Sequence, residues 1–480
     1  MSDSSKPSRR SQPFRPASLA GEARRTFLKQ MSALGAGGVA GPLISGLGAA
    51  SPLALGLGAM SEAAAQSATD YKALVCIFLY GGNDPYNTIV PYDAAGYRKY
   101  AAARTDIALP RNSLEATALR VQGGADGDAQ FALAPGLAPL KPLFDKGQLA
   151  VQLNVGPLMV PTTKAQYISG SVPLPPKLFS HNDQQAYWQA LAPEGASTGW
   201  GGRLADLFAS GKGKSTFANV TAGEGAVLLS GRHVAGYRVG IDGSTPIELL
   251  RRDTYGSSTC TALLRELITQ SQQHVLGDLH AQTVARSIEA DATLRAALEP
   301  ITVQGDFATP FAKQLKVVAR MIAARRSLEV NRQVFVVTLN GFDNHDGLMG
   351  AHKDLLTQLG SAMAAFQQAI DAMGMGKQVT TFTASEFGRT LTSNGNGSDH
   401  GWGGHHLVMG GAVRGGRLYG SHPDIDVAGP GFVDHGRMLP STSVETFAAT
   451  LGGWFGASAG DLDDIFPALR EFGARKAGFV

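Results

Sequence analysis

Several strand-like runs of this chain are each followed by side chains that could bind a metal ion. These candidate ligands are carboxylates and imidazoles, namely Asp84, Asp343, His345, Glu386, His400 and His405. The carboxyl ends of parallel strands meet at one edge of a sheet, so residues distant in sequence converge there. Mixed carboxylate and imidazole ligands suit Zn²⁺ or Mn²⁺. The sequence therefore predicts a divalent metal site, with one or two ions, at that edge.

The spacing of these residues favours a shared site. Asp343 and His345 are two residues apart, so in an extended segment both side chains point the same way. Asp84 follows a Gly-Gly turn, where the backbone can approach a ligand closely; an Asx turn or helix cap is the alternative interpretation. His405 and His406 would face opposite ways in an extended segment, so only one of them would reach the site.

Two further residues have types suited to ester chemistry. Ser180 precedes the helix-like segment NDQQAYWQAL, and a hydroxyl at a helix start near a cation is placed for nucleophilic attack. A helix cap is an equally open role for it, and the adjacent His181 and Asp183 are further ligand types. Arg389 offers a guanidinium fork for phosphate or sulfate oxygens. A surface ion pair with Glu386 is its alternative role.

The elements that would position these residues alternate between strands and helices. Apolar or β-branched runs predict strands at 73–80, 148–155, 216–221, 226–229, 333–340, 378–384 and 406–410. Helical spacing occurs in 261–298, 311–328 and 352–373. A strand–helix–strand order predicts a parallel, right-handed crossover. We expect residues 66–480 to form one α/β domain with a mostly parallel sheet flanked by helices, and with helical and loop insertions.

The first 65 residues have the features of an export leader. ARRTFLK at 23–29 is similar to a twin-arginine signal with the pair Arg24 and Arg25, and a Gly- and Ala-rich stretch follows it. Small residues near Ala65 suit signal peptidase. These features predict a disordered extension, a cleaved leader, the twin-arginine translocase as partner, and a periplasmic or secreted protein. A membrane anchor is the alternative, but many glycines make the stretch a poor spanning helix, so no stable span is expected in the mature form.

Charge and cysteine content exclude some classes of protein. The chain has 42 Lys/Arg and 39 Asp/Glu, and residues 1–65 hold seven and three of these, so the remainder carries a net charge of −1. This balance gives no reason to expect nucleic acid as a partner. Cys76 and Cys260 are too few for a thiolate metal site, and a bond between them stays open. The sequence has no Walker-type loop and no GxSxG elbow, which disfavours an ordinary serine esterase.

An ordered set of motifs resembles the bacterial domain-of-unknown-function family 1501, over roughly residues 74–455. The motifs are GGND…NT, FSHNDQQAYW, GWGGR, QLKVVARMIAAR, VFVVTLNGFDNHDG, TASEFGRT and DHGWGGHH…GGAVRGG. The resemblance implies an alkaline phosphatase-like or sulfatase-like fold with a metal site at the carboxyl ends of the strands. It implies Asp84 as the ligand after the first strand and Ser180 as the nucleophile. The late ligands that it implies are Asp343, His345, Glu386 and His400.

Two departures from the superfamily pattern bear on the number of ions. The chain has Asp-x-His at Asp343, where two-metal members usually have Asp-x-x-x-His, and Glu386-Phe387, where they usually have Asp-His. Our leading hypothesis is an exported metal-dependent hydrolase that acts on a small anionic ester of phosphate or sulfate. The second hypothesis is a non-enzymatic exported protein of envelope assembly or partner binding. The third is a metal hydrolase of another bond type.

Overall fold

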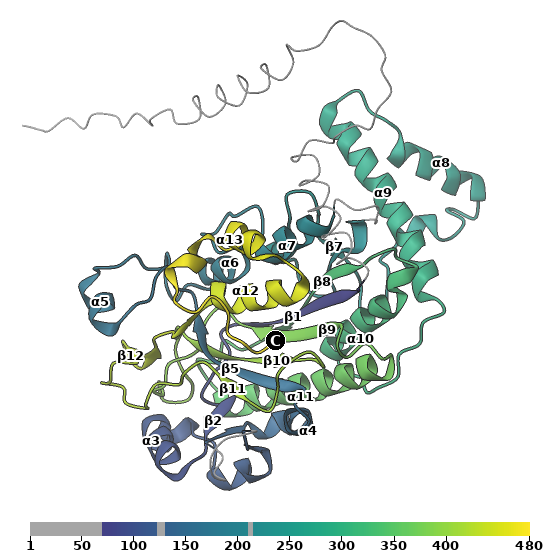
Figure 1. Cartoon of the computed structure of the whole chain (residues 1–480). Coiled ribbons are helices and arrows are strands. Elements are labelled where there is room, and N and C mark those ends of the chain that lie inside the picture. The colour runs from purple at the N-terminus through teal and green to yellow at the C-terminus, as the bar shows by residue number, and fades with distance from the viewer. Residues whose placement is uncertain (1–69, 122–129, 210–214) are drawn as a thin grey trace, which may run out of the picture. The chain divides into compact units, whose positions relative to one another are not determined.

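A nine-stranded sheet organises the part of the chain that the computed structural model describes, residues 70–121, 130–209 and 215–480 (Figure 1). The strand order is β11-β5-β10-β9-β1-β8-β6-β7, with β14 beside β5. The bounds are β1 Lys72–Tyr80, β5 Leu149–Gly156, β6 Asn219–Thr221, β7 Tyr237–Arg238, β8 Arg332–Asn340, β9 Val379–Ala384, β10 Gly404–Met409, β11 Leu418–Tyr419 and β14 Thr442–Ser443. β10 is antiparallel to both of its neighbours, and the other described pairs of this sheet are parallel. The expected mostly parallel sheet is confirmed.

The central strand β1 is apolar on both sides because both faces of the sheet are covered. Val75 and Ile77 enter one hydrophobic core, while Leu74, Cys76 and Phe78 enter the other. This alternation follows from the two-residue period of a strand. Continuous apolar runs of this kind are typical of parallel strands buried on both faces.

Helices form the layers on the two faces (Figure 1). One face is covered by α4 Lys141–Asp145, α10 Pro310–Ala323 and α11 Leu348–Ala372. The other is covered by α6 His181–Ala190, α7 Trp200–Phe208, α12 Val444–Phe455 and α13 Ala459–Ile465. The remaining helices are α3 Ala94–Arg104, α5 Lys164–Ser169, α8 Ser258–Thr269 and α9 Val275–Leu298. Two small sheets consist of β2 Ile89–Pro91, β3 Ala118–Leu119 and β4 Phe131–Leu133, and of β12 Phe432–Val433 and β13 Arg437–Met438.

Most predicted elements are present, and two predictions need correction. The expected strand 226–229 is wrong: Val227–Leu229 form a 3-10 turn, closed by the Ser230 N–H donating to the Val227 carbonyl at 2.9 Å. The expected helix 261–298 is interrupted, because Gln270 is extended and His274 starts a new helix as its N-cap. Short runs carry too little periodicity to decide between a strand and a turn.

Two expectations concern the cysteines and the membrane. Cys76 and Cys260 are both free thiols, so the disulfide that the sequence left open does not form. Burial raises the pKa of the Cys76 thiol. Among the described helices, none is both long enough and apolar enough to cross a bilayer. The export motif, with Arg24 and Arg25, lies outside the described residues.

Glu445, in the first turn of α12, should make stability depend on pH. Its burial raises the pKa of the carboxyl from the ordinary 4.5 to about 7, partly offset by hydrogen bonds such as that from the Tyr187 hydroxyl. The folded protein therefore binds this proton more tightly than the unfolded chain does. The resulting stabilisation of the folded state is full below about pH 4.5 and is lost as pH rises through 7. We expect the free energy of unfolding of the unaltered protein to fall by on the order of 3 kcal/mol over this range, and that of Glu445→Gln to stay nearly constant.

Urea unfolding of the unaltered protein and of Glu445→Gln at pH 5 and pH 8 measures this effect. The variant should be the more stable of the two at pH 8 and should change little between the two values. An identical loss of stability in both proteins would show that Glu445 does not carry the effect.

Candidate metal centre

The loops after β1, β8 and β9 meet at one edge of the main sheet. In the register of the sheet, Tyr80 of β1 lies opposite Asn340 of β8, and Phe78 lies opposite Ala384 of β9. The three strands are parallel, so their carboxyl ends share this edge. Strand β10 runs the other way and begins there at Gly404. The geometry therefore brings residues 81–88, 341–347 and 385–403 together, as the sequence predicts.

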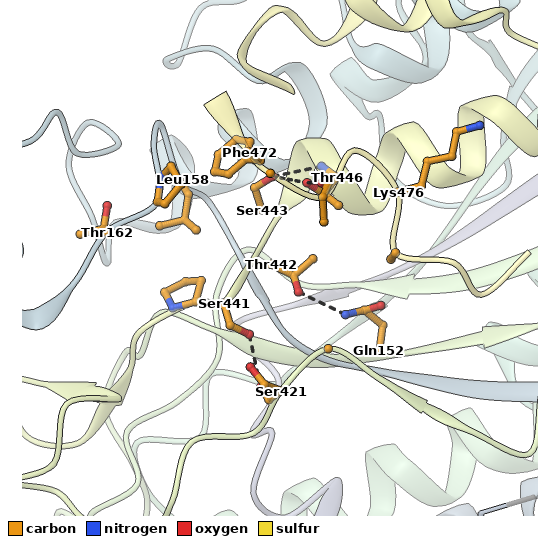
Figure 2. A pocket seen from close by; sticks show the side chains of 16 residues that line it. Gln152, Leu158, Thr162, Ser421, Ser441, Thr442, Ser443, Thr446, Phe472 and Lys476 are labelled. Carbon is orange, nitrogen blue, oxygen red and sulfur yellow. Dashed lines mark hydrogen bonds between the residues drawn. The ribbon is translucent and has the colours of Figure 1, made fainter. Parts of the chain in front are cut away.

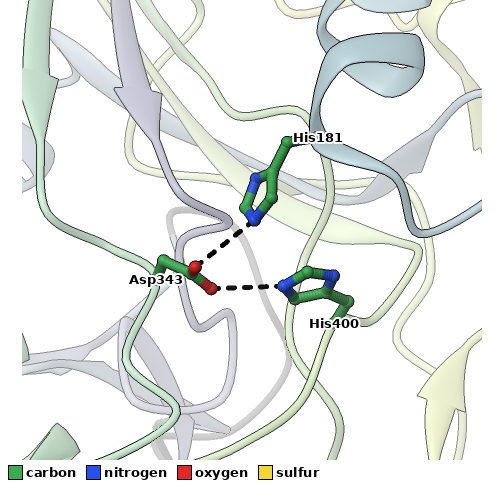
Figure 3. Close-up of side chains that lie close together, drawn as sticks. All are labelled: His181, Asp343 and His400. Atoms are coloured by element: carbon green, nitrogen blue, oxygen red, sulfur yellow. Dashed lines mark hydrogen bonds and ion pairs between the residues drawn. The ribbon is translucent and has the colours of Figure 1, made fainter.

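Three side chains from different elements form the core of the site (Figure 3). His181 comes from the start of α6, Asp343 from the loop after β8, and His400 from the loop before β10. Their potential ligand atoms all lie within 4.8 Å of one another. His181 Nε2 is 3.4 Å from Asp343 Oδ2, and His400 Nε2 is 3.2 Å from Asp343 Oδ1. Two imidazoles therefore face one carboxylate.

A third imidazole, that of His345, joins this group. Its Nε2 lies 3.1 Å from Asp343 Oδ1 and 3.0 Å from His400 Nε2. The side chain of Asp343 is 45% exposed, so the site reaches solvent. We call His181, Asp343, His345 and His400 the His-Asp cluster.

Each imidazole of the cluster is held through its other nitrogen, Nδ1. His400 Nδ1 is 2.8 Å from the Phe179 carbonyl oxygen, which can only accept a hydrogen bond. His181 Nδ1 is 2.8 Å from Glu386 Oε1, and His345 Nδ1 is 3.1 Å from Asp399 Oδ1. Since all three acceptors are oxygens, each Nδ1 carries the proton. When a ring is neutral, this tautomer directs its Nε2 lone pair toward Asp343.

With all three rings neutral, the Nε2 atoms offer lone pairs and no N–H groups to the space around Asp343, which suits a cation. The two facing nitrogens of His345 and His400, 3.0 Å apart, both carry lone pairs when neutral, so they require a proton or a metal ion between them. Metal-binding histidines usually donate their other ring N–H to a carboxylate or a carbonyl, as these do. Three imidazoles and a carboxylate are a donor set that suits a transition metal. The chemistry of these side chains thus fits a bound divalent ion.

Local charges shift the pKa values in the cluster in ways that follow from their surroundings. The hydrogen bond to Glu386 raises the pKa of His181. Burial lowers the pKa of His400, which favours the neutral, ligand-competent ring. Burial alone would raise the pKa of Asp343, but the hydrogen bond and charge of Arg389 hold it below its usual value. Asp343 is therefore a carboxylate at neutral pH.

Glu386 and Arg389 do not lie where the sequence analysis expected them. Glu386 is fully buried, and its Oε1 accepts hydrogen bonds from the Gly81 backbone N–H at 2.9 Å and from Gln185 Nε2 at 3.0 Å, besides His181. Its Oε1 thus has three partners within the protein. Arg389 is fully buried, and it donates to Asp343 Oδ1 at 2.7 Å and to the Ser398 carbonyl. It therefore orients the carboxylate and is not placed to contact a substrate oxyanion.

Asp84 lies outside the His-Asp cluster, which corrects its assignment as a metal ligand. Its carboxylate forms a buried ion pair with Arg104 of α3. The same carboxylate accepts from the backbone N–H groups of Tyr86 at 3.0 Å and Asn87 at 3.2 Å. This Asx-type turn is the alternative that the sequence left open. The lone pairs of Asp84 are thus occupied by donors of the protein.

His405 and Ser180 also differ from what was expected. His405 is buried in β10 with its Nδ1 accepting from the Asn154 N–H at 3.0 Å, and burial lowers its pKa well below the usual range. It is a structural histidine, as is His406, whose pKa burial lowers to about 3. Ser180 is the N-cap residue of α6, but its hydroxyl does not cap the helix and instead donates to Asp183 Oδ2 at 2.9 Å.

Two members of the site were not among the predicted ligands. His181 follows Ser180 directly, so the motif FSHND contained the signal for it. Asp399 precedes His400 and anchors His345 at a distance of 54 residues along the chain. Only a fold that brings the loops together could reveal that pairing.

Glu386→Gln tests the role of the buried carboxylate that holds His181. An amide of the same shape keeps the packing but removes the negative charge that draws the Nδ1 proton. We expect the affinity of the protein for Zn²⁺ to fall by about 10–100-fold, the usual cost of losing such a supporting partner. A competition titration against a fluorescent zinc chelator measures it. Unchanged affinity would contradict the positioning role of Glu386.

Comparison with known proteins found solved structures of low similarity and no match among curated proteins. Ps i-CgsB in complex with k-i-k-neocarrahexaose is 8% identical over 85% of this chain and 77% of that chain, with a TM-score of 0.36. The lipoteichoic acid synthase LtaP from Listeria monocytogenes is 9% identical over 82% and 74%, with a TM-score of 0.32. Wild-type alkaline phosphatase PafA is 10% identical over 67% and 63%, with a TM-score of 0.28. Similarity of this degree does not bear on the chemistry of the site.

The match to a family model is extensive. It covers residues 71–442, well over half of the chain, and includes every member of the His-Asp cluster. The resemblance inferred from the ordered motifs is thereby confirmed. The chain belongs to the family described as protein of unknown function (DUF1501).

Proposed function

We propose that this chain is an exported, metal-dependent hydrolase of phosphate or sulfate esters that uses one divalent ion, Zn²⁺ or Mn²⁺. The observation that carries the proposal is the His-Asp cluster, in which three Nε2 atoms face one carboxylate. An ion bound there would supply positive charge to polarise an ester and to stabilise its transition state. Since Asp84 is paired with Arg104, the described residues support one ion better than two.

The protein side chains would divide the remaining tasks. His181, His345, His400 and Asp343 would hold the ion, while Glu386 and Arg389 would fix the orientation of their partners. Ser180 is the candidate nucleophile, because it directly precedes His181 and its hydroxyl already donates to the Asp183 carboxylate. Attack by Ser180 Oγ would form an ester bond to phosphorus or sulfur and break the bond from that atom to the alcohol oxygen. The Ser180 proton would pass through Asp183 to that oxygen, so that the alcohol leaves. Water would then attack the seryl ester, return a proton to Ser180 Oγ and release phosphate or sulfate.

The test is hydrolysis of p-nitrophenyl phosphate and p-nitrophenyl sulfate by the mature protein loaded with Zn²⁺ or with Mn²⁺. We expect turnover of one of these esters, and a loss of at least about 10³-fold in Ser180→Ala with its metal content unchanged. Turnover that persists in Ser180→Ala would remove the serine from the mechanism. Metal-loaded protein that hydrolyses neither ester would contradict the proposal.

A non-enzymatic exported protein is the second candidate, and one observation favours it. Arg389, the expected contact for an ester oxyanion, is fully buried and donates its hydrogen bonds to the protein itself. In this role the metal would stabilise the loops at the sheet edge for binding a partner. Bound metal without turnover of either ester is the result that this candidate predicts.

A further inference from the structure

One arginine, Arg437 of β13, contacts both partners of the hydrogen bond that orients the His400 imidazole. Phe179 supplies the acceptor of that bond, a carbonyl oxygen 2.8 Å from His400 Nδ1. The guanidinium of Arg437 lies over the Phe179 ring, with Cζ 4.2 Å from the ring centroid. Its Nε donates to the His400 backbone carbonyl at 2.8 Å. Arg437 therefore links the residue that holds the imidazole to the residue that carries it.

The backbone of Phe179 has a conformation that needs support. Its φ of 71° is in the left-handed region, which side chains other than glycine seldom enter and which persists only where the surroundings hold it. Lys177 also has a positive φ, of 44°, and the Ser180 N–H closes the turn by donating to the Lys177 carbonyl at 3.1 Å. In this strained turn the Phe179 carbonyl reaches His400 Nδ1. Contacts from other parts of the fold must therefore keep the turn in place.

The Phe179 ring makes such contacts on two sides. It meets Trp402 edge-on, with ring centroids 6.3 Å apart, and packs against an apolar cluster that includes Leu158. Leu158 and Phe472, which packs against the same cluster, also line a cavity of about 480 Å³ (Figure 2). No member of the His-Asp cluster lines that cavity. Arg437, with a side chain only 18% exposed, lies against the Phe179 ring as a cation over its face.

Arg437 is itself fixed by its neighbours. The carbonyl of Met438, the next residue of β13, accepts from the Gly403 N–H at 2.8 Å, which ties β13 to the loop before β10. The guanidinium is 3.9 Å from Asp434, whose Oδ2 accepts from the Tyr167 hydroxyl at 2.6 Å. A guanidinium suits this place because it can stack on a ring and donate hydrogen bonds in its own plane at the same time.

We propose that Arg437 is a positioning residue of the metal centre, which holds Phe179 and His400 in place so that the His400 ring keeps its proton on Nδ1 and its Nε2 free for an ion. This inference rests on the proposed metal site. Without Arg437, the strained Phe179 backbone would relax and withdraw its carbonyl from Nδ1. The His400 proton would then lie on Nε2 in part of the molecules, and a nitrogen that carries a proton has no lone pair to offer a metal.

The test compares Arg437→Met with the unaltered mature protein in two measurements. NMR of zinc-free protein with labelled histidine rings distinguishes the Nδ1–H and Nε2–H forms at neutral pH, and His400→Ala assigns the signal. We expect the Nδ1–H form in the unaltered protein and a mixture of both forms in Arg437→Met. Zinc affinity, from competition with a fluorescent chelator, should fall by about tenfold. Phe179→Leu, which removes the ring under the guanidinium, should change both measurements in the same direction.

Arg111→Met is the matched control. Arg111 also stacks on a ring, that of Tyr92 at 4.9 Å, and its Nε also donates to a backbone carbonyl, that of Tyr92 at 3.2 Å, but it has no contact with the His-Asp cluster. It should keep the His400 tautomer and the zinc affinity of the unaltered protein. Thermal unfolding identifies the variants that fold, and Phe179→Leu decides the matter if Arg437→Met does not.

Two results would overturn the proposal: an unchanged His400 tautomer in the folded variants, or a zinc affinity equal to that of Arg111→Met. Because the tautomer is measured without zinc and without substrate, the positioning role stands or fails separately from the hydrolysis of either ester.

Discussion

Protein carrying His400→Ala should retain less than about a tenth of the Zn²⁺ that the unaltered protein holds after gel filtration. His400 Nε2 faces both Asp343 Oδ1 and His345 Nε2, so its removal takes away a central ligand. Loss of a partner that merely supports a ligand already costs about 10–100-fold in metal affinity, and loss of a ligand should cost at least as much. Mass spectrometry of metal bound per chain is the measurement.

His280→Ala is the control for this experiment. His280 is an exposed histidine on α9, outside the cluster, so its removal subtracts one imidazole without touching the site. It should bind metal as the unaltered protein does. If His400→Ala and His280→Ala retain equal amounts of zinc, the ion is bound elsewhere and the His-Asp cluster is not its site.

Arg104→Ala should lower the free energy of unfolding by about 3–5 kcal/mol, because it leaves a buried carboxylate without its counter-charge. Arg104 is fully buried and Asp84 is 1% exposed, so neither group is hydrated in the folded protein. The guanidinium also donates to the carbonyl oxygens of Thr390 at 3.2 Å and Leu391 at 3.3 Å. Chemical denaturation followed by circular dichroism measures the change.

Lys99→Ala on the same helix is the matched control. Lys99 and Asp424 form an ion pair at 2.6 Å, but their side chains are 47% and 75% exposed. Such a surface pair contributes about 1 kcal/mol or less. Zinc binding should survive in both variants under native conditions. A loss of zinc in folded Asp84→Asn, which keeps the shape of the side chain and removes its charge, would return Asp84 to the list of metal ligands.

The convergence of the site could be predicted from the sequence, because it depends on regular features of strands. The runs that became β1, β8 and β9 are continuously apolar, and parallel strands of this kind end at one edge. Asp343, His345 and His400 follow from that rule, and they do lie together. The convergence of these side chains could therefore be predicted before the geometry was known.

The roles of individual residues could not be predicted, because they depend on partners that no local pattern specifies. Asp84 lies on the expected turn, but its carboxylate forms an ion pair with Arg104 of α3. Glu386 follows β9 as predicted, but its side chain is fully buried and its Oε1 lies 2.8 Å from His181 Nδ1. His405 has the right chemistry but is buried in β10, where its Nδ1 accepts from the Asn154 N–H. Contacts between remote segments thus decide which of the predicted side chains join the His-Asp cluster and which lie outside it.

The central claim is that one divalent ion is held by the His-Asp cluster, and anomalous diffraction at the zinc edge tests it most directly. Crystals of zinc-loaded protein should show one strong peak bounded by the Nε2 atoms of His181, His345 and His400 and by the carboxylate of Asp343. A peak at Asp84, or no peak at the cluster in protein that binds zinc in solution, would contradict the account.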